Sequence, residues 1–319
     1  MATALATFPS QLLPFVEPQR DELTRIQSLF EQGTIASAPR AARLLRDYAA
    51  SKRAESTTEA EWRHTIDKEL RPHPVFPYTQ MDILVRRSFN KPRGYAGDAA
   101  MLDYIYHHPS THFEIASLPR PVQSAMQFTT NSPASRAVRN RAFLLAHEID
   151  AIAARTPNAE ILSLACGHLR EAASITANLK RFVAIDQDTE SLKEITRNHS
   201  GIEAREGSVK TVIAKGRELG QFDFVYAAGL YDYLNDKVAA RLLQALFDRL
   251  KPGGKLWIAN FMPDIVDRGF MEAYMDWWLI YRDERDMMKL AEALPANATA
   301  ETFVEHEQNI VFLEAVRNA

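Results

Sequence analysis

From residue 160 onward, short apolar segments alternate with helical patterns, and this alternation constrains the fold more than any other feature of the sequence. Strand patterns lie at 160–165, 181–186, 202–206, 222–228 and 255–261. Helical patterns separate several of them, at 169–179, 189–197 and 237–250. Buried strands that alternate with helices predict βαβ units and a parallel sheet. Two more strand patterns, 300–307 and 309–316, meet at Gln308-Asn309 and predict an antiparallel hairpin.

Before residue 155 the pattern is helical, with a proline-rich connector at 71–78. The segments with helical spacing are 20–32, 40–52, 57–70, 79–89, 99–107, 118–128 and 133–154. After the fifth strand, 262–294 predicts one or two long aromatic helices, with Tyr274 and Trp278 facing a pocket. We therefore predict an α/β fold. Residues 133–319 form a Rossmann-like, seven-stranded, mostly parallel sheet with a terminal antiparallel hairpin, and residues 1–132 form a helical cap or substrate domain.

Composition narrows the function classes. Of 319 residues, 46% are apolar and 25% charged, as in soluble globular proteins. The net charge of −3 gives no reason to expect a nucleic-acid partner. The single cysteine, Cys166, excludes a disulfide within the chain and a Cys-rich zinc site, and we expect no metal. The sequence has no apolar run that could span a bilayer, and its N-terminus lacks a basic region, so we expect no membrane association, no secretory signal and a cytoplasmic location.

The first strand meets the following helical pattern through a turn of small residues, Ala165-Cys166-Gly167. In doubly wound folds this turn binds the ligand, because small side chains let it approach the backbone amides. Asp186 ends the second strand, 19 positions after Gly167, where a carboxylate binds a pair of ribose hydroxyls, and Gln187 follows it. The alternative for the small-residue turn is an ordinary connection between a strand and a helix. The alternative for Asp186 is an acid that only caps a helix or lies in a loop.

Two further strand ends carry polar or small residues. Ser208 and Val209 follow the third strand, where the serine hydroxyl could bond to an adenine edge. The fourth strand runs into Ala228-Gly229 and then Tyr231, Asp232 and Tyr233. Because ligands sit at the carboxyl ends of parallel strands, both turns should border the pocket.

The helical half contributes two candidate groups. The loop 90–98 contains Arg93, which could pair with a carboxylate, and Tyr95, which could close over a ligand. Its alternative is a connector in which Asp98 caps the next helix. Arg136, Arg139 and Arg141 lie with Asn140 on one helix. Arg136 and Asn140, four residues apart, share one face and could meet the charged end of a ligand; the alternative is a solvated basic face.

Taken in order, LACGH, the acid in VAID, EGS, VYAAGLYDYL, LKPGGKLWIANF and the closing hairpin resemble class I S-adenosylmethionine-dependent methyltransferases over about residues 155–319. A narrower resemblance rests on NKPRGYAGDAAMLDYIY (90–106), SRAVRNR (135–141) and YMDWWLIYRDERDM (274–287). These stretches are similar to a bacterial group of methyltransferases related to the enzyme that makes 3-hydroxypalmitic acid methyl ester. That group has a helical N-terminal domain that caps the cofactor pocket.

The resemblance implies S-adenosylmethionine as the cofactor and a small-molecule acceptor, methylated on a carboxylate or hydroxyl oxygen. The implied cofactor contacts are Ala165, Gly167, Asp186, Gln187, Ser208, Val209, Ala228, Gly229, Tyr95 and Arg136. The implied catalytic group is Tyr95, Tyr231 and Arg93 or Arg282, with Asp232 as the base for a hydroxyl or amine. The alternatives are an N- or S-methyltransferase of specialised metabolism and, given the glycine-poor first loop, a non-catalytic cofactor-binding regulator. The sequence is also compatible with a homodimer.

Overall fold

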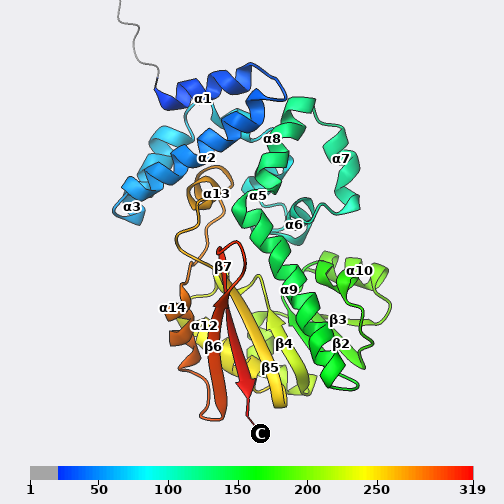
Figure 1. Cartoon of the computed structure of the whole chain (residues 1–319). Coiled ribbons are helices and arrows are strands. Elements are labelled where there is room, and N and C mark those ends of the chain that lie inside the picture. Colours follow the sequence, from blue (N-terminus) through cyan, green and yellow to red (C-terminus); the bar gives the residue numbers. More distant parts are fainter. Residues whose placement is uncertain (1–20, 319) are drawn as a thin grey trace, which may run out of the picture.

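A seven-stranded sheet forms the C-terminal part of the computed structural model, which describes residues 21–318 (Figure 1). The strands are β1 (Glu160–Leu164), β2 (Arg181–Asp186), β3 (Ile202–Glu206), β4 (Phe222–Ala227), β5 (Leu250–Phe261), β6 (Ala298–Val304) and β7 (Ile310–Arg317). Their order is β3-β2-β1-β4-β5-β7-β6. Neighbours from β3 to β5 pair in parallel, whereas β7 pairs antiparallel with both β5 and β6. This arrangement confirms the predicted fold class.

Alternate residues of each strand bury opposite faces of the sheet, because successive side chains of a strand point to opposite sides. On β4, Phe224 and Tyr226 join the core that includes Ile149 of the helix before β1. Val225 and Ala227 join the core on the other face. The helices after β1 are α10 (Thr189–Asn198), α11 (Val209–Lys215), α12 (Asp236–Phe247), α13 (Arg268–Tyr274) and α14 (Glu284–Ala291). Both faces of the sheet are therefore covered, as a parallel sheet requires.

Helices precede the sheet, and all but the last of them lie above it in Figure 1. They are α1 (Glu22–Glu31), α2 (Ser37–Glu55), α3 (Glu59–Thr65), α4 (Phe76–Thr79), α5 (Ile83–Asn90), α6 (Ala99–Ile105), α7 (His112–Ala116), α8 (Arg120–Thr130) and α9 (Pro133–Arg155). The long α9 begins where Ser132 caps it and Pro133 occupies its first turn. It runs from the other helices down along the sheet (Figure 1). The predicted boundary after residue 132 falls between α8 and α9, and the division into two domains stays a prediction.

The helical part is joined to the sheet through α13, which packs on α2. Gly269 permits the close approach, because a Cβ there would lie 2.4 Å from the carbonyl oxygen of Ala49. Next to it, the buried carboxylate of Glu272 accepts hydrogen bonds from Trp62 Nε1 at 2.7 Å and Arg53 Nε at 3.2 Å. The segment after β5 thus anchors the helices above the sheet.

Two predicted helices are absent or interrupted, and both corrections have a physical cause. In place of a helix over 169–179, a short 3₁₀ turn covers Arg170–Ser174. The carboxylate of Asp150 accepts the backbone N–H groups of Thr176 and Ala177 at 2.9–3.1 Å, which keeps that stretch out of a helix.

In place of long helices over 262–294, the short α13 and α14 flank a non-helical segment, 275–283. Asp276 there has a left-handed backbone (φ 47°), and its carboxylate accepts from Arg71 at 2.8 Å and from Trp278 Nε1 at 2.9 Å. The N–H of Arg282 then donates to the carbonyl of Phe261 at 3.0 Å. These long-range bonds fix the chain in an extended course beside β5.

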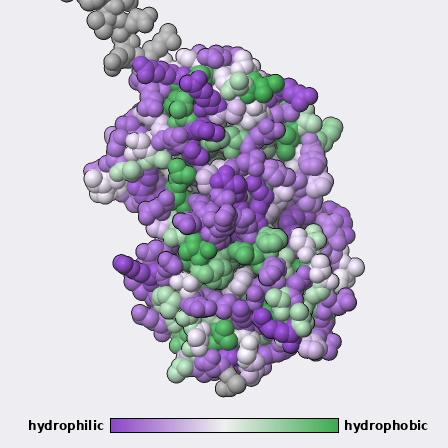
Figure 2. Space-filling view, viewed as in Figure 1, coloured by the Kyte–Doolittle hydropathy of each residue, from purple (hydrophilic) through white to green (hydrophobic). Residues whose placement is uncertain are grey.

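The face of the molecule shown in Figure 2 is largely hydrophilic, with hydrophobic residues gathered near its middle. Within residues 21–318, no helix combines the length and apolarity needed to cross a bilayer. The N-terminal stretch on which the prediction of no secretory signal rests lies outside the described residues.

Candidate active site

A cavity of about 580 Å³ opens at the carboxyl ends of β1, β2 and β4. The loops after β1 to β4 form one wall, and residues of the loop 93–99 and of α9 form the other. The strand order changes direction between β1 and β4, and ligands of open α/β sheets bind at such a switch point. The volume lies in the range of about 300–1,000 Å³ that small-molecule sites occupy.

The loop after β1 has an unusual backbone. Ala165, Gly167 and Leu169 all have left-handed φ values, of 53°, 54° and 52°. For a residue with a side chain this conformation costs roughly 1–2 kcal/mol, and it persists where the surroundings fix it, often at functional sites. Ala165 and Gly167 line the cavity, as predicted for a ligand-binding turn. Cys166 also lines it, and burial raises the pKa of its thiol, which suits a packing residue better than a nucleophile.

Asp186 ends β2 and lines the cavity beside Gln187. Its carboxylate accepts the backbone N–H of Gly167 at 2.8 Å and of Asp188 at 2.9 Å. Burial raises its pKa, although these amides act in the opposite direction. Because a carboxylate has about four acceptor positions, two remain for hydroxyl donors of a ligand.

The turns after β3 and β4 complete this wall. Ser208 caps α11 by accepting the N–H of Thr211 at 3.3 Å, and both Ser208 and Val209 line the cavity. Ala228 and Gly229, after β4, line it as well. The structure therefore brings together at one cavity all the cofactor contacts predicted from the strand ends.

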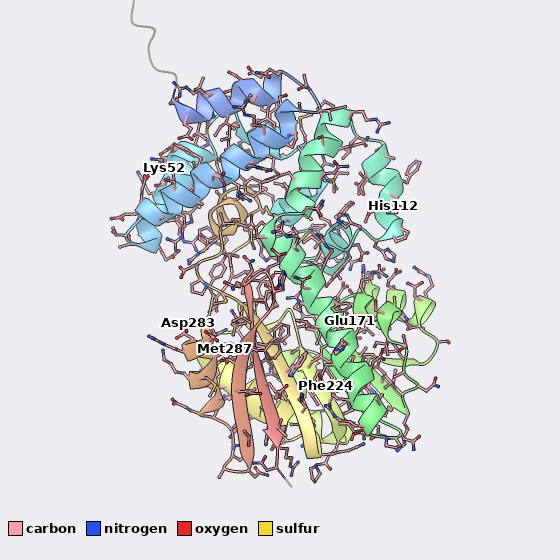
Figure 3. The ribbon with its side chains drawn as sticks, viewed as in Figure 1. Lys52, His112, Glu171, Phe224, Asp283 and Met287 are labelled. Atoms are coloured by element: carbon pink, nitrogen blue, oxygen red, sulfur yellow. The ribbon has the colours of Figure 1, made fainter. Side chains whose placement is uncertain are left out.

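Arg141 and Glu171 bring two opposite charges to the cavity, and neither is among the predicted cofactor contacts. Arg141 extends from α9, is 6% exposed, and points its guanidinium at Gly229, whose added Cβ would lie 3.6 Å from Nη2. It forms no ion pair with any carboxylate of residues 21–318. Glu171 is buried beside α9 (Figure 3), accepts from the Tyr226 hydroxyl at 2.7 Å, and has a pKa raised by burial. Both side chains line the cavity.

The sequence holds a signal for Arg141. It lies three residues after Val138 and four before Leu145, both buried on α9, and helical spacing places it on the same face. An arginine on a buried helix face needs an anion or acceptor partner, because an uncompensated buried charge is costly.

The predicted ligand-covering loop lies at the cavity mouth. Arg93 donates to Asp188 Oδ2 at 2.7 Å, and Tyr95 lines the cavity with its ring 6.5 Å from that of Tyr233. Asp98 caps α6 by accepting the N–H of Met101. The capping role that the sequence offered as the alternative for this loop is therefore also present.

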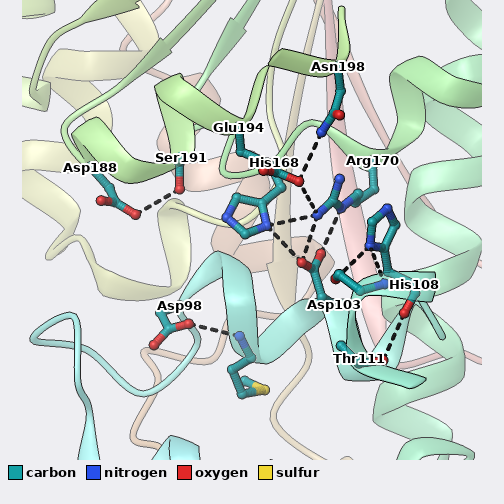
Figure 4. A network of polar contacts seen from close by, with 12 residues as sticks. Asp98, Asp103, His108, Thr111, His168, Arg170, Asp188, Ser191, Glu194 and Asn198 are labelled. Atoms are coloured by element: carbon teal, nitrogen blue, oxygen red, sulfur yellow. Dashed lines mark hydrogen bonds and ion pairs between the residues drawn. The ribbon is translucent and has the colours of Figure 1, made fainter. Parts of the chain in front are cut away.

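A polar network ties this mouth to the loop after β1 (Figure 4). Asp103 of α6 accepts from Arg170 Nε and Nη2, both at 2.7 Å, and contacts His168 Nδ1 at 2.9 Å. Arg93 Nη1 lies 3.3 Å from the other ring nitrogen, Nε2. Arg170 Nη2 also lies 3.2 Å from His168 Nδ1. Both nitrogens of His168 are therefore engaged.

Arg136 lies outside the cavity lining. Its guanidinium donates to Glu307 at 2.7 Å and to the carbonyl of Asn131 at 2.6 Å. Asn140, on the same face, donates to Glu305 at 3.2 Å. This face of α9 therefore holds the turn between β6 and β7, and its placement does not support the predicted cofactor contact of Arg136.

Tyr231, Asp232 and Arg282 also lie outside the lining. Tyr231 is fully buried in the core on the α12 side of the sheet. Asp232 accepts the N–H of Phe261 at 2.7 Å, and Arg282 donates to the carbonyl of Tyr231 at 2.9 Å. These three residues fix the loop after β4 to β5, so their placement does not support the predicted contact with substrate.

The aromatic segment contributes through a different residue from those predicted. Tyr274 is fully buried, and Trp278 lies under Arg63, 3.9 Å from its guanidinium carbon. Neither lines the cavity. Instead, Trp277 donates its indole N–H to the hydroxyl of Tyr233 at 2.8 Å, and Tyr233 does line it. The helical spacing that favoured Tyr274 and Trp278 does not apply, because α13 ends at Tyr274.

Residues 161–254 match the model of a family described as a methyltransferase domain. No curated protein matches the sequence. Among solved structures, a possible exported protein from Bordetella parapertussis is 18% identical, with a TM-score of 0.59 over 87% of this chain and 97% of its own, which shows a shared fold. An amino pentose methyltransferase from Micromonospora echinaspora with bound S-adenosylmethionine is 14% identical, with a TM-score of 0.43 over 58% of this chain and 96% of its own.

The family match spans the strands and turns that build most of the strand-end wall of the cavity. It does not reach the helical part, and the narrower resemblance to the 3-hydroxypalmitic acid methyl ester group has no match among these proteins. Residues 161–254 are therefore similar to a methyltransferase domain, and they lie in a Rossmann-like sheet.

Proposed function

We propose that the protein transfers the methyl group of S-adenosylmethionine to an oxygen of a small-molecule acceptor, a carboxylate or a hydroxyl. The observation that carries this proposal is the pair Arg141 and Glu171. One buried cation and one buried acid line the same cavity without forming an ion pair with each other. The methionine end of the cofactor carries a carboxylate and an ammonium group, so it complements both charges.

The other cofactor contacts follow from the strand ends. The free acceptor positions of Asp186 suit the ribose hydroxyls. Ser208 and Val209 would border the adenine, and the small residues Ala165 and Gly229 would leave room for the chain between ribose and carboxylate. The residues present therefore fit the cofactor.

When bound, S-adenosylmethionine supplies a methyl group on a positively charged sulfur, which is already an activated electrophile. The chain must then hold the acceptor oxygen in line, about 3–3.5 Å from the methyl carbon, and exclude water. Tyr95 and the loop around it cover the mouth, where Arg93 fastens the loop to Asp188. Leu230 and Leu234 give the acceptor side an apolar wall.

Turnover with different acceptors distinguishes this proposal from its alternatives, which are N- or S-methylation and a non-catalytic regulator. The test is release of S-adenosylhomocysteine by the full chain with panels of carboxylic acids, alcohols, amines and thiols. The proposal expects turnover with acids or alcohols. Turnover only with amines or thiols would replace it by the first alternative, and cofactor binding without turnover would favour the regulator. A homodimer and a cytoplasmic location stay predictions.

A matched pair of variants tests the assigned cofactor site. Arg141→Gln removes the buried cation, and we expect the Kd for S-adenosylhomocysteine to rise about 10- to 100-fold, since a hydrogen bond to a charged group contributes about 1.5–3 kcal/mol. Arg136→Gln, five residues earlier on the same helix and outside the cavity, is the control and should leave the Kd unchanged. The reverse result would restore the contact predicted from sequence.

A further inference from the structure

Arg141 and Glu171 carry opposite charges at one cavity, and both residues are largely withdrawn from water. They are 6% and 8% exposed. Within residues 21–318, neither of them forms an ion pair. Opposite charges attract more strongly in a protein interior than in water, because the effective dielectric constant is lower. Other contacts must therefore keep the two side chains from pairing.

Tyr226 holds Glu171 from the side of the sheet. Its hydroxyl donates to Glu171 Oε1 at 2.7 Å. Burial and the nearby charge of Glu171 raise the pKa of this phenol, so it stays protonated. On β4, Tyr226 lies between Ser163 of β1 and Trp257 of β5, and its ring stacks on that of Phe224 with 5.4 Å between the centroids. These neighbours fix the hydroxyl, which in turn fixes the carboxylate of Glu171.

Tyr106 faces Arg141 from the helical side of the cavity. It follows α6 directly and lines the cavity. Burial raises the pKa of its phenol, whereas the charge of Arg141 and a hydrogen bond with its guanidinium act in the opposite direction. Arginine only donates, so the phenol oxygen accepts. Each of the two charges thus has a tyrosine hydroxyl beside it.

The separation of the two charges matters for a ligand that carries an ammonium and a carboxylate group. If Arg141 and Glu171 paired with each other, such a ligand would have to break their ion pair before it could bind. A Glu171 that is held by Tyr226 keeps its other acceptor positions for the ammonium group. Binding to a site arranged in advance costs less free energy of ordering.

We propose that Tyr226 is a positioning residue for the cofactor: its hydroxyl keeps Glu171 apart from Arg141, so that both charges remain available to the methionine end. This rests on the proposed function, because it assumes that the cavity binds S-adenosylmethionine. Tyr226 acts through Glu171 and has no step of its own in the methyl transfer. Without its hydroxyl, Glu171 is free to turn toward Arg141.

Two ligands separate the charged end of the cofactor from the remainder. S-adenosylhomocysteine carries the ammonium and the carboxylate, whereas 5′-methylthioadenosine keeps the adenine, the ribose and the sulfur but lacks both charged groups. Each is titrated calorimetrically into the full chain, as wild type and as Tyr226→Phe. We expect the Kd for S-adenosylhomocysteine to rise about 10- to 100-fold in the variant. The Kd for 5′-methylthioadenosine should stay unchanged, which also shows that the variant is folded.

A double variant tests whether Tyr226 acts through Glu171. Residues that act as one unit show non-additive effects. In the background of Glu171→Gln, which has no negative charge to hold, Tyr226→Phe should therefore change the Kd for S-adenosylhomocysteine much less than it does in the wild type. Tyr274→Phe is the matched control, because it removes a buried hydroxyl that has no partner and lies outside the cavity lining. It should change neither Kd.

Three results would overturn the proposal: equal S-adenosylhomocysteine affinity of Tyr226→Phe and the wild type, an equal loss of affinity for both ligands in Tyr226→Phe, or fully additive losses in the double variant. Absence of S-adenosylhomocysteine binding in the wild type would instead refute the proposed function itself.

Discussion

Asp103→Asn isolates the polar network that connects the helical part to the cofactor loop. The side chain of Asp103 is only 5% exposed, and its two carboxylate oxygens accept both guanidinium bonds of Arg170 and face His168. Asparagine keeps the size of the side chain but removes the charge and one of the two acceptor oxygens. Arg170 then has Glu194, at 3.2 Å, as its remaining ion-pair partner.

Removing one partner of a buried ion pair costs about 3–5 kcal/mol, and the remaining contact of Arg170 with Glu194 places the expected loss at the lower end. At about 2.1 cal/mol/K of unfolding entropy per residue, a chain of 319 residues loses roughly 4–5 °C of Tm. Because His168 and Arg170 belong to the loop that lines the cavity, we also expect weaker binding of S-adenosylhomocysteine.

The pH dependence gives a second readout. Burial raises the pKa of Asp103, the hydrogen bonds from Arg170 and His168 lower it, and the net direction is down. Its contribution to stability is therefore present above the unfolded value of about 3.9 and disappears as the pH falls through the lower folded value. The difference in Tm between wild type and variant should shrink below about pH 4.

Scanning calorimetry and calorimetric titration measure these effects. Glu190→Gln, which removes an exposed ion pair with Lys193 on α10, is the control and should behave as the wild type. An Asp103→Asn protein with unchanged Tm and unchanged ligand affinity would refute the structural role assigned to the network.

Three further predictions follow from the surroundings of the cavity. A Cβ at Gly97 would lie 2.8 Å from both the Tyr233 hydroxyl and a ring carbon of Trp277, and Gly97 and Tyr233 line the cavity. Gly97→Ala should therefore displace these side chains, and we expect a slower turnover with a raised KM for the acceptor, measured by S-adenosylhomocysteine release; unchanged kinetics would contradict this close packing. Tyr231→Phe removes a buried hydroxyl without a partner, so turnover should persist and thermal stability should stay equal or rise by up to about 1 kcal/mol. Burial raises the pKa of Asp232 to about 6. As the pH rises from about 4 to 6, the wild type should therefore lose stability relative to Asp232→Asn, because the unfolded chain gives up this proton more readily than the folded one. Chemical denaturation across that range checks the sign, and turnover should survive this substitution because Asp232 lies outside the cavity.

The cavity-lining residues at the ends of the strands were predictable from sequence. The alternation of strands and helices sets both the topology of the sheet and the edge at which ligands bind. Asp186 and Gly229 follow buried strands, and the fold brings their turns together at the switch point. The fold class followed from the same pattern, since buried strands that alternate with helices form a parallel sheet covered on both faces.

The remaining site residues depend on contacts between distant parts of the chain. The hydrogen bond from Trp277 to the Tyr233 hydroxyl joins residues 44 positions apart, and no local pattern reports it. The missing helix over 169–179 depends on Asp150, which precedes the sheet. Asp232 and Arg282 have chemistry that suits a site, and only their tertiary contacts reveal their structural role.

Calorimetric titration with S-adenosylmethionine, on the wild type and on Asp186→Ala, tests the central claim most directly. We expect one site per chain, with affinity about 10- to 100-fold weaker in the variant, because the carboxylate would lose charge-assisted hydrogen bonds to the ribose. Glu190→Gln, on the adjacent helix, should bind as the wild type does. No binding by the folded wild type, or equal binding by Asp186→Ala, would contradict the assignment of this cavity to the methyl donor.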